Sequence, residues 1–289
     1  IRFFAVEQLI DIADEEHGKP ALIARLCNAE EDSIRLRTKI LDGLADLGWN
    51  VGDEAEMELT LHGKIANIPA NQVEVFVDRK PPYALHVKGQ VTERFLFGPK
   101  LELHTELVVL PGESSFQLND TITNTGAQEQ EFQILYHANF GSPLLASGTE
   151  VLVPTNKVTP FNDHAATGLK NWNTYSEPTT GFVEQVYLLE PKGDHNDHTM
   201  ALLVNRKNAQ AASIGWSLKQ LPYLTVWKNT GAEADGYVTG IEPGTNYPNN
   251  RSVEREAGRV PKLAPGESRE FTLTFGLHSG VAEVGAALK

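Results

Sequence analysis

Apolar and polar residues alternate along most of the chain after Asn50. Valines occupy every second position of the run Val73–Val77, and the same period of two returns in four further runs. These runs are 101–107, 116–122, 132–136 and 271–277. A period of two sends successive side chains to opposite faces of a strand, so each run predicts a β-strand with one buried, apolar face.

Turn-forming sequences separate the predicted strands. They combine proline, asparagine and glycine, and they are Pro111-Gly112, Asn124-Thr125-Gly126, Asn229-Thr230-Gly231 and Pro265-Gly266. Many short strands joined by such turns predict a mainly β fold, a large antiparallel β-sandwich. The chain shows no repeat of ~20–50 residues, which argues against a propeller or a solenoid.

The first 49 residues follow a helical period instead. Apolar residues recur at spacings of three and four from Phe3, and Gly48 is a natural helix C-cap. We therefore divide the chain into a short helical N-terminal segment, 1–49, and a β-sandwich domain, 50–289. The helices of the first segment either pack as an ordinary part of the protein or form an arm that binds a partner.

Composition restricts the partners and the compartment. The formal net charge of −13 and the pI near 5.2 argue against nucleic acid, whose phosphates require clustered Lys and Arg, and against an anionic membrane surface. Cys27 is the only cysteine, so neither an intramolecular disulfide nor a cysteine-rich zinc site can form. No apolar run reaches the ~18 residues of a membrane helix, and no signal peptide is visible. We expect a cytoplasmic location, although a disulfide-free periplasmic protein would have the same composition.

Three segments differ from ordinary strand-and-turn sequence. Each places one ionisable residue, namely His62, His137 or Glu242, among glycine, proline, asparagine and aromatic residues. The segments are Leu61-His62-Gly63-Lys64-Ile65-Ala66-Asn67-Ile68-Pro69-Ala70, Leu135-Tyr136-His137-Ala138-Asn139-Phe140-Gly141-Ser142-Pro143-Leu144 and Gly240-Ile241-Glu242-Pro243-Gly244-Thr245-Asn246-Tyr247-Pro248. Such a setting is typical of side chains at the rim of a β scaffold.

In this order, His, His and then Glu, the three segments resemble those of the aldose 1-epimerase superfamily and, within it, a less characterised epimerase-like branch. The resemblance covers roughly residues 55–280. It implies a galactose mutarotase-like supersandwich, with 50–289 as the sugar-binding and catalytic domain. It also implies a sugar mutarotase-like isomerase that interconverts the anomers of a free sugar, with a small-molecule sugar as partner.

Interconversion of anomers requires one base and one acid. The C1 hydroxyl loses a proton while the ring oxygen gains one, and both steps reverse after the C1–C2 bond has turned. By resemblance, Glu242 is the general base at O1, His137 is the general acid at the ring oxygen, and His62 orients the sugar. Further candidate substrate contacts are Lys64, Asn67, Asn139, Asn246 and, as a stacking platform, Trp227. The reaction requires neither a metal nor an organic cofactor.

The sequence also departs from the superfamily. No arginine takes the expected sugar-contacting place before the first His, and the Asp that galactose mutarotases add between the second His and the Glu is not clearly placed. The nature of the sugar therefore stays open, and basic Lys64 leaves an acidic or phosphorylated sugar conceivable. The oligomeric state is not predicted.

Two other functions compete with the isomerase. One is a non-catalytic carbohydrate-binding or sugar-sensing protein on the same scaffold. The other is a lyase or a hydrolase, although a hydrolase usually needs two facing carboxylates and only Glu242 stands in a suitable segment. The cluster Asp194-His195-Asn196-Asp197-His198 is similar to a metal-ligand set, but ligands this close in sequence rarely converge on one ion, and we expect an exposed loop instead.

Overall fold

The computed structural model describes residues 53–54, 57–58, 62–95 and 98–288. It divides into two compact units, Ile1–Lys64 and Ile65–Lys289, each of which is described by itself. In the first unit the short strands β1 (Asp53–Glu54) and β2 (Met57–Glu58) pair antiparallel. The helices predicted over 1–49 lie outside the described residues.

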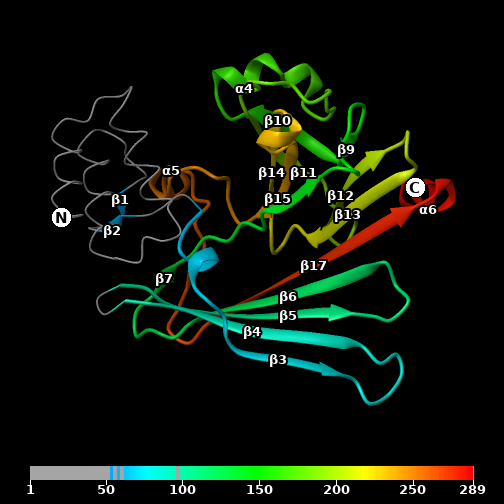
Figure 1. The fold of residues 1–289 in the computed structure, drawn as a ribbon. Helices are drawn as coiled ribbons and strands as arrows, with labels where there is room; N and C mark the ends of the chain where they lie inside the picture. Colours follow the sequence, from blue (N-terminus) through cyan, green and yellow to red (C-terminus); the bar gives the residue numbers. More distant parts are fainter. Residues whose placement is uncertain (1–52, 55–56, 59–61, 96–97, 289) are drawn as a thin grey trace, which may run out of the picture. The chain divides into compact units, whose positions relative to one another are not determined.

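An eight-stranded antiparallel sheet is the largest part of the second unit (Figure 1). Its strands, in spatial order, are β3 (Asn71–Val77), β4 (Leu85–Arg94), β5 (Lys100–Val109), β6 (Ser115–Asn124), β17 (Ser268–Ser279), β13 (Gln210–Ser217), β12 (His198–Asn205) and β9 (Glu150–Leu152). β17, the last strand in the chain, lies in the middle of this sheet between β6 and β13. The middle of the sheet is therefore complete only when the C-terminal strand β17 has paired with β6 and β13, which lie earlier in the chain.

A five-stranded antiparallel sheet lies against part of the larger one. Its strands, in spatial order, are β10 (Thr155–Pro160), β11 (Gln185–Pro191), β14 (Tyr223–Asn229), β15 (Val238–Gly244) and β8 (Ala138–Gly141). Its inner face supplies Leu224 and Ile241 to a core that also contains Phe271 and Leu273 of β17. Each of these four side chains is at most 1% exposed. Burial of such a side chain contributes roughly 1.5–3 kcal/mol, so this interface holds the two sheets together.

Short elements complete the second unit. They are the pair β7 (Gln130–Glu131) and β16 (Lys262–Leu263), the helices α4 (Asp163–Thr167), α5 (Arg251–Glu256) and α6 (Val281–Ala287), and the 3-10 turns η1 (Ile65–Asn67), η2 (Leu169–Asn171) and η3 (Glu233–Asp235). At the predicted turns, Gly112 and Gly266 adopt φ values of +85° and +74°, which glycine reaches without strain. Among the described residues, no helix is long and apolar enough to cross a membrane.

The predicted β-sandwich is confirmed, but the pattern was wrong in two places. The segment 132–136 forms no strand apart from an isolated bridge between Leu135 and Gly244, because here the chain passes from β7 of one sheet to β8 of another. The run Val73–Val77 is a strand, yet all seven residues of β3 are exposed. β3 is an edge strand of the eight-stranded sheet, and among the described residues the core cluster between the two sheets includes none from β3 or β4.

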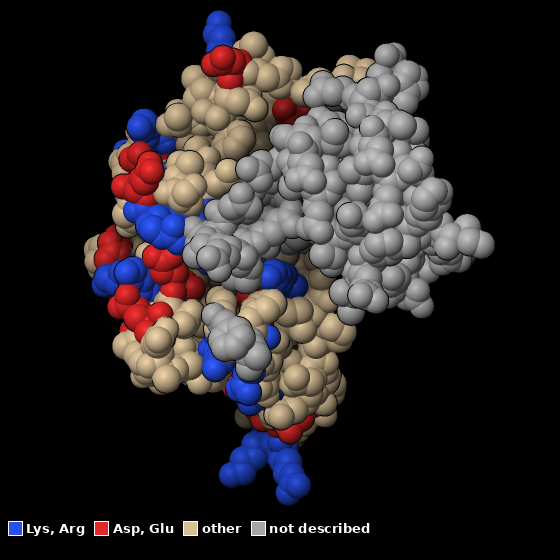
Figure 2. All heavy atoms as spheres, turned by 90° about the vertical axis from the view of Figure 1, so that its left-hand side faces the viewer, with Lys and Arg blue, Asp and Glu red and all other residues tan. Residues whose placement is uncertain are grey.

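Charges of both signs lie interspersed on the surface. Figure 2 shows Lys and Arg side chains next to Asp and Glu side chains over the described part of the face that it presents. In the second unit some charges form ion pairs, such as Lys88 of β4 with Glu106 of β5, whose Nζ and Oε1 atoms are 3.2 Å apart. Exposed pairs of this kind contribute little to stability.

Candidate active site

The outward face of the five-stranded sheet brings several predicted site residues together. β15 pairs with β14 so that Glu242 lies opposite Thr225 and Gly240 lies opposite Trp227. β15 also pairs with β8, with Gly240 opposite Asn139. Because alternate residues of a strand share one face, all five lie on the same side of the sheet. The intervening residues, among them Ile241, point into the core, which identifies this side as the outward one.

His137 and Glu242 are in direct contact. His137 immediately precedes β8, and its Nε2 atom is 3.1 Å from Oε1 of Glu242. The Glu242 side chain is 4% exposed, whereas that of His137 is 31% exposed. This separation suits an ion pair, but the angles do not make a hydrogen bond, and among the described residues Oε1 of Glu242 has no hydrogen-bond partner. The contact therefore places a buried carboxyl next to a partly solvated imidazole.

Burial changes the acidity of Glu242. Removal from water, together with the negative charge of Glu184, raises the pKa of Glu242 from 4.5 to about 8. At neutral pH the carboxyl of the ligand-free protein is therefore mostly protonated. A group with a pKa near the working pH can both accept and release a proton, and this property is typical of acid–base catalysts.

Gly240 makes room for this carboxyl. A Cβ atom at position 240 would lie 3.1 Å from Cδ and 3.3 Å from Cγ of Glu242, and closer still to Oε1. The carboxyl thus folds back along its own strand over the glycine, which faces the same side two residues earlier. Any other residue at position 240 would force the carboxyl away from His137. The glycine stands in the third segment singled out in the sequence, where its role was not predicted.

Trp227 lies against the imidazole of His137. The two ring centroids are 5.8 Å apart and the planes are inclined by 61°, an edge-to-face arrangement. The indole Nε1 donates a 2.6 Å hydrogen bond to Oε2 of Glu184, which immediately precedes β11. Trp227 is partly exposed, so its apolar ring lies beside the acid–base pair at the surface of the sheet. Glu184 was missed because no motif surrounds it in the sequence.

Asn246 lies close to Glu242 in the chain, but its polar atoms are engaged within the protein. It is 5% exposed. Its Nδ2 donates to the carbonyl of Tyr247 at 2.6 Å, and its Oδ1 accepts from the Thr245 hydroxyl at 2.9 Å. The backbone N–H of Tyr247 in turn donates to the buried carboxylate of Glu254. This geometry suits a support for the chain after Glu242 and does not by itself favour a contact with sugar.

Of the remaining predicted site residues, the structure places only some relative to His137 and Glu242. Asn139 is exposed on the same face as Glu242. Asn67 is exposed in η1, which packs against β4. His62 and Lys64 belong to the unit Ile1–Lys64, and the structure relates neither side chain to Glu242. The structure thus brings together His137, Glu242, Trp227 and Asn139.

Comparison with known proteins places the chain in a family. Residues 42–277 match the family described as a domain of unknown function, DUF4432. The chain belongs to the DUF4432 family. Among curated proteins, none matches it.

Solved structures resemble this DUF4432 protein as well. A proposed aldose 1-epimerase from Klebsiella pneumoniae is 44% identical with a TM-score of 0.79, and the match covers 81% of this chain and 61% of that protein. Slr1438 from Synechocystis sp. PCC 6803 has a TM-score of 0.55 at 16% identity, covering 79% of this chain and 73% of that one. A galactose mutarotase-like protein from Clostridium acetobutylicum has a TM-score of 0.53 at 16% identity, covering 76% and 69%. The last two show a shared fold, and the predicted resemblance to galactose mutarotase-like proteins is confirmed.

The histidine- and aspartate-rich segment of the DUF4432 chain forms a tight loop. The Oδ1 atom of Asp194 accepts hydrogen bonds from the backbone N–H groups of Asn196 at 2.8 Å and of His198 at 2.9 Å. Its carboxylate therefore closes a turn, as aspartate commonly does. Within the described ranges no group of three or more His, Cys, Asp or Glu side chains is placed to hold a metal ion.

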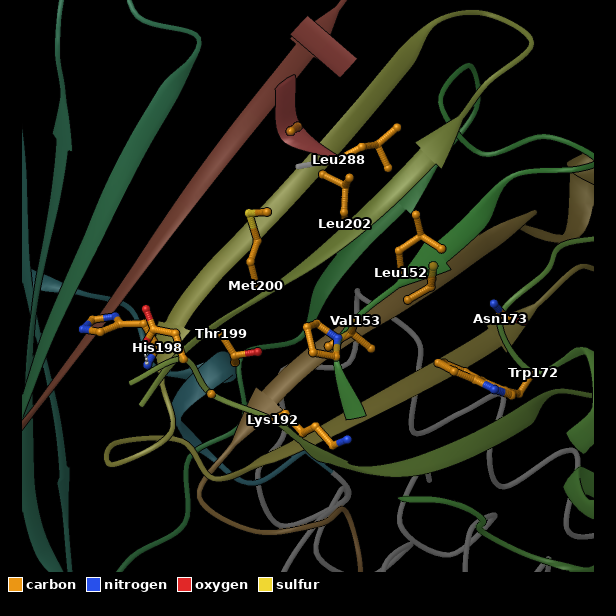
Figure 3. A pocket seen from close by; sticks show the side chains of 15 residues that line it. Leu152, Val153, Trp172, Asn173, Lys192, His198, Thr199, Met200, Leu202 and Leu288 are labelled. Atoms are coloured by element: carbon orange, nitrogen blue, oxygen red, sulfur yellow. Dashed lines mark hydrogen bonds between the residues drawn. The ribbon is translucent and has the colours of Figure 1, made fainter. Parts of the chain in front are cut away.

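A separate groove of about 900 Å³ lies beside β9 and β12 (Figure 3). Leu152, Val153, Met200 and Leu202 line it together with Trp172 and Lys192. None of the residues around Glu242 belongs to its lining. Trp172 also packs against the core, so this tryptophan both lines the groove and contributes to the core.

Proposed function

We propose that this DUF4432 protein is a sugar mutarotase-like isomerase of the aldose 1-epimerase type, which interconverts the anomers of a free sugar. The observation that carries the proposal is the 3.1 Å contact between Nε2 of His137 and Oε1 of Glu242. The two oxygens that exchange protons during mutarotation are both bonded to C1 of the sugar. An acid and a base that act on them must therefore be near neighbours, as these two side chains are.

The proposed roles follow from the properties of each group. Ionised Glu242 removes the proton from the C1 hydroxyl, and protonated His137 gives a proton to the ring oxygen. The bond from C1 to the ring oxygen breaks as the C1 carbonyl forms, the C1–C2 bond turns, and closure on the other face returns both protons. Because burial raises the pKa of Glu242 to about 8, its ionised form is a stronger base than an exposed carboxylate.

Neighbouring side chains fit a sugar. The partly exposed ring of Trp227 offers an apolar surface beside His137, and Asn139 offers an amide on the same face. His62, Lys64, Asn67 and Asn246 stay predictions from the sequence. The relatives also support the proposal, since one is described as a proposed aldose 1-epimerase and another as galactose mutarotase-like.

Anomer exchange measured by polarimetry and by NMR on a panel of free sugars tests the proposal. We expect the protein to accelerate exchange of at least one sugar and Glu242→Gln to abolish the acceleration, while Glu190→Gln, an exposed glutamate on β11, retains it. The panel should include phosphorylated and acidic sugars because of Lys64. Failure to accelerate exchange of any sugar would sink the proposal. If sugars then still raised the melting temperature, the protein would be a non-catalytic sugar binder.

A further inference from the structure

Glu184 is a carboxylate beside the candidate site for which neither the sequence motifs nor the family match supplies a role. It immediately precedes β11 and is exposed, unlike Glu242. Its Oε2 atom accepts the indole N–H of Trp227 at 2.6 Å. That distance is shorter than the usual N–H···O hydrogen bond, as expected when the acceptor carries a full charge. The bond fixes one edge of a ring that is otherwise partly exposed.

The same ring contacts the proposed acid. The Trp227 and His137 rings meet edge to face at 5.8 Å, and Nε2 of His137 is 3.1 Å from Glu242. A line of contacts therefore runs from Glu184 through Trp227 and His137 to Glu242. It crosses four separate stretches of the chain, because these residues lie before β11, on β14, before β8 and on β15. A change in the orientation of the indole would remove the packing that limits the imidazole ring.

We propose that Glu184 is a positioning residue, which holds the Trp227 indole against His137 and so keeps the His137 imidazole in place beside the Glu242 carboxyl. This inference rests on the proposed function. Glu184 itself is not required to touch the sugar or to transfer a proton. Its charge has a second effect that follows from the same proximity, because it adds to the burial that raises the pKa of Glu242.

Two substitutions separate the hydrogen bond from the charge. Glu184→Gln keeps an oxygen that can accept the indole N–H but removes the charge, whereas Glu184→Ala removes both. We expect kcat/KM of Glu184→Ala to fall about tenfold, mainly through kcat, because the acid is no longer held in place. Glu184→Gln should keep kcat/KM within about twofold at the pH where kcat/KM is highest. The rise of kcat/KM with pH that follows the ionisation of Glu242 should move to lower pH, because losing the charge of Glu184 lowers the pKa of Glu242.

Glu190→Gln is the matched control. Glu190 is an exposed glutamate of β11, it also contacts solvent on the outward side, and its Oε1 pairs with Lys157 at 3.7 Å instead of with a tryptophan. This variant should keep both the wild-type rate and the wild-type pH profile. A difference between Glu184→Gln and Glu190→Gln assigns the shift of the pH profile to the charge of Glu184 near Glu242. The additional loss of kcat/KM in Glu184→Ala assigns that loss to the contact with Trp227.

Tryptophan fluorescence provides a readout that needs no sugar. The chain has four tryptophans, so the emission of Trp227 is obtained by subtracting the spectrum of Trp227→Phe in each background. We expect Glu184→Ala to change the Trp227 emission and Glu184→Gln to change it less. If emission changes while the wild type turns over no sugar, the proposed function fails and the positioning contact stands. If Glu184→Ala keeps both the wild-type emission and the wild-type kcat/KM, the positioning role is refuted.

Discussion

The burial of Glu242 should make the stability of the protein depend on pH, and Glu242→Gln should remove that dependence. The folded pKa of about 8 lies above the ordinary value of 4.5, so between these pH values the folded state binds more protons than the unfolded state. The free energy of unfolding therefore falls as pH rises through this window. The cost is absent below about pH 4.5 and fully developed above about pH 8, where the carboxylate is buried in its charged form.

The size of the effect follows from the same values. A rise from 4.5 to about 8 corresponds to roughly 5 kcal/mol at ~1.4 kcal/mol for each tenfold change in proton affinity. Glutamine has nearly the same shape and does not titrate. The unfolding free energy of Glu242→Gln, relative to that of the wild type, should thus increase by roughly 4 kcal/mol between pH 5 and pH 9, since part of the window lies below pH 5. Contact with protonated His137 would reduce this value, because a positive charge favours the ionised carboxylate.

Urea unfolding of both proteins at a series of pH values measures this difference. Glu190→Gln serves as the control, since its side chain is 50% exposed and its curve should run parallel to that of the wild type. Linear extrapolation carries an error of about 10–15%, well below the expected effect. A difference between wild type and Glu242→Gln that stayed constant across the pH range would refute the raised pKa of Glu242.

Two further substitutions test the surroundings of Glu242. Gly240→Ala should displace the Glu242 carboxyl from His137 and lower kcat about tenfold or more. Gly285→Ala in α6, where a Cβ meets nothing within 4 Å, should leave kcat unchanged. Steady-state kinetics on the two variants measures the difference. Arg259→Ala should destabilise the fold by ~3–5 kcal/mol in urea unfolding, because it leaves the fully buried carboxylate of Glu254 without its bidentate partner. An Arg259→Ala variant as stable as the wild type would mean that Glu254 is satisfied by other groups.

The local alternation of apolar and polar residues predicted most strands of this fold, but it did not predict which strand faces are buried against another sheet. The alternation at Val73–Val77 correctly indicates a strand, since the period of two is a property of the backbone. Burial depends on which sheet lies opposite, and β3 lies at an edge beyond the core. The segment 132–136 has the same alternation, yet it passes between two sheets and forms only an isolated bridge.

In the candidate site, too, local sequence predicted individual residues but not the contacts between them. His137 and Glu242 were predicted because unusual local sequence surrounds each of them. Their contact depends on the register of β15 with β8, which local sequence does not encode. Glu184 carries no local signal, and only its hydrogen bond to Trp227 places it at the site. Asn246 had a suggestive segment, but its amide is engaged by neighbouring backbone and side chain.

The pH dependence of anomer exchange, followed by exchange NMR, tests most directly whether His137 and Glu242 act as an acid–base pair. For a sugar that the protein turns over, the rate should rise with pH as Glu242 ionises, whose pKa is about 8, and should fall again where His137 loses the proton that it donates. Glu242→Gln should lose ~10²–10⁴-fold of the acceleration at the pH where the wild type is fastest. A wild type that exchanges no sugar faster than buffer does, or a Glu242→Gln variant that keeps the full rate, would contradict the proposed chemistry.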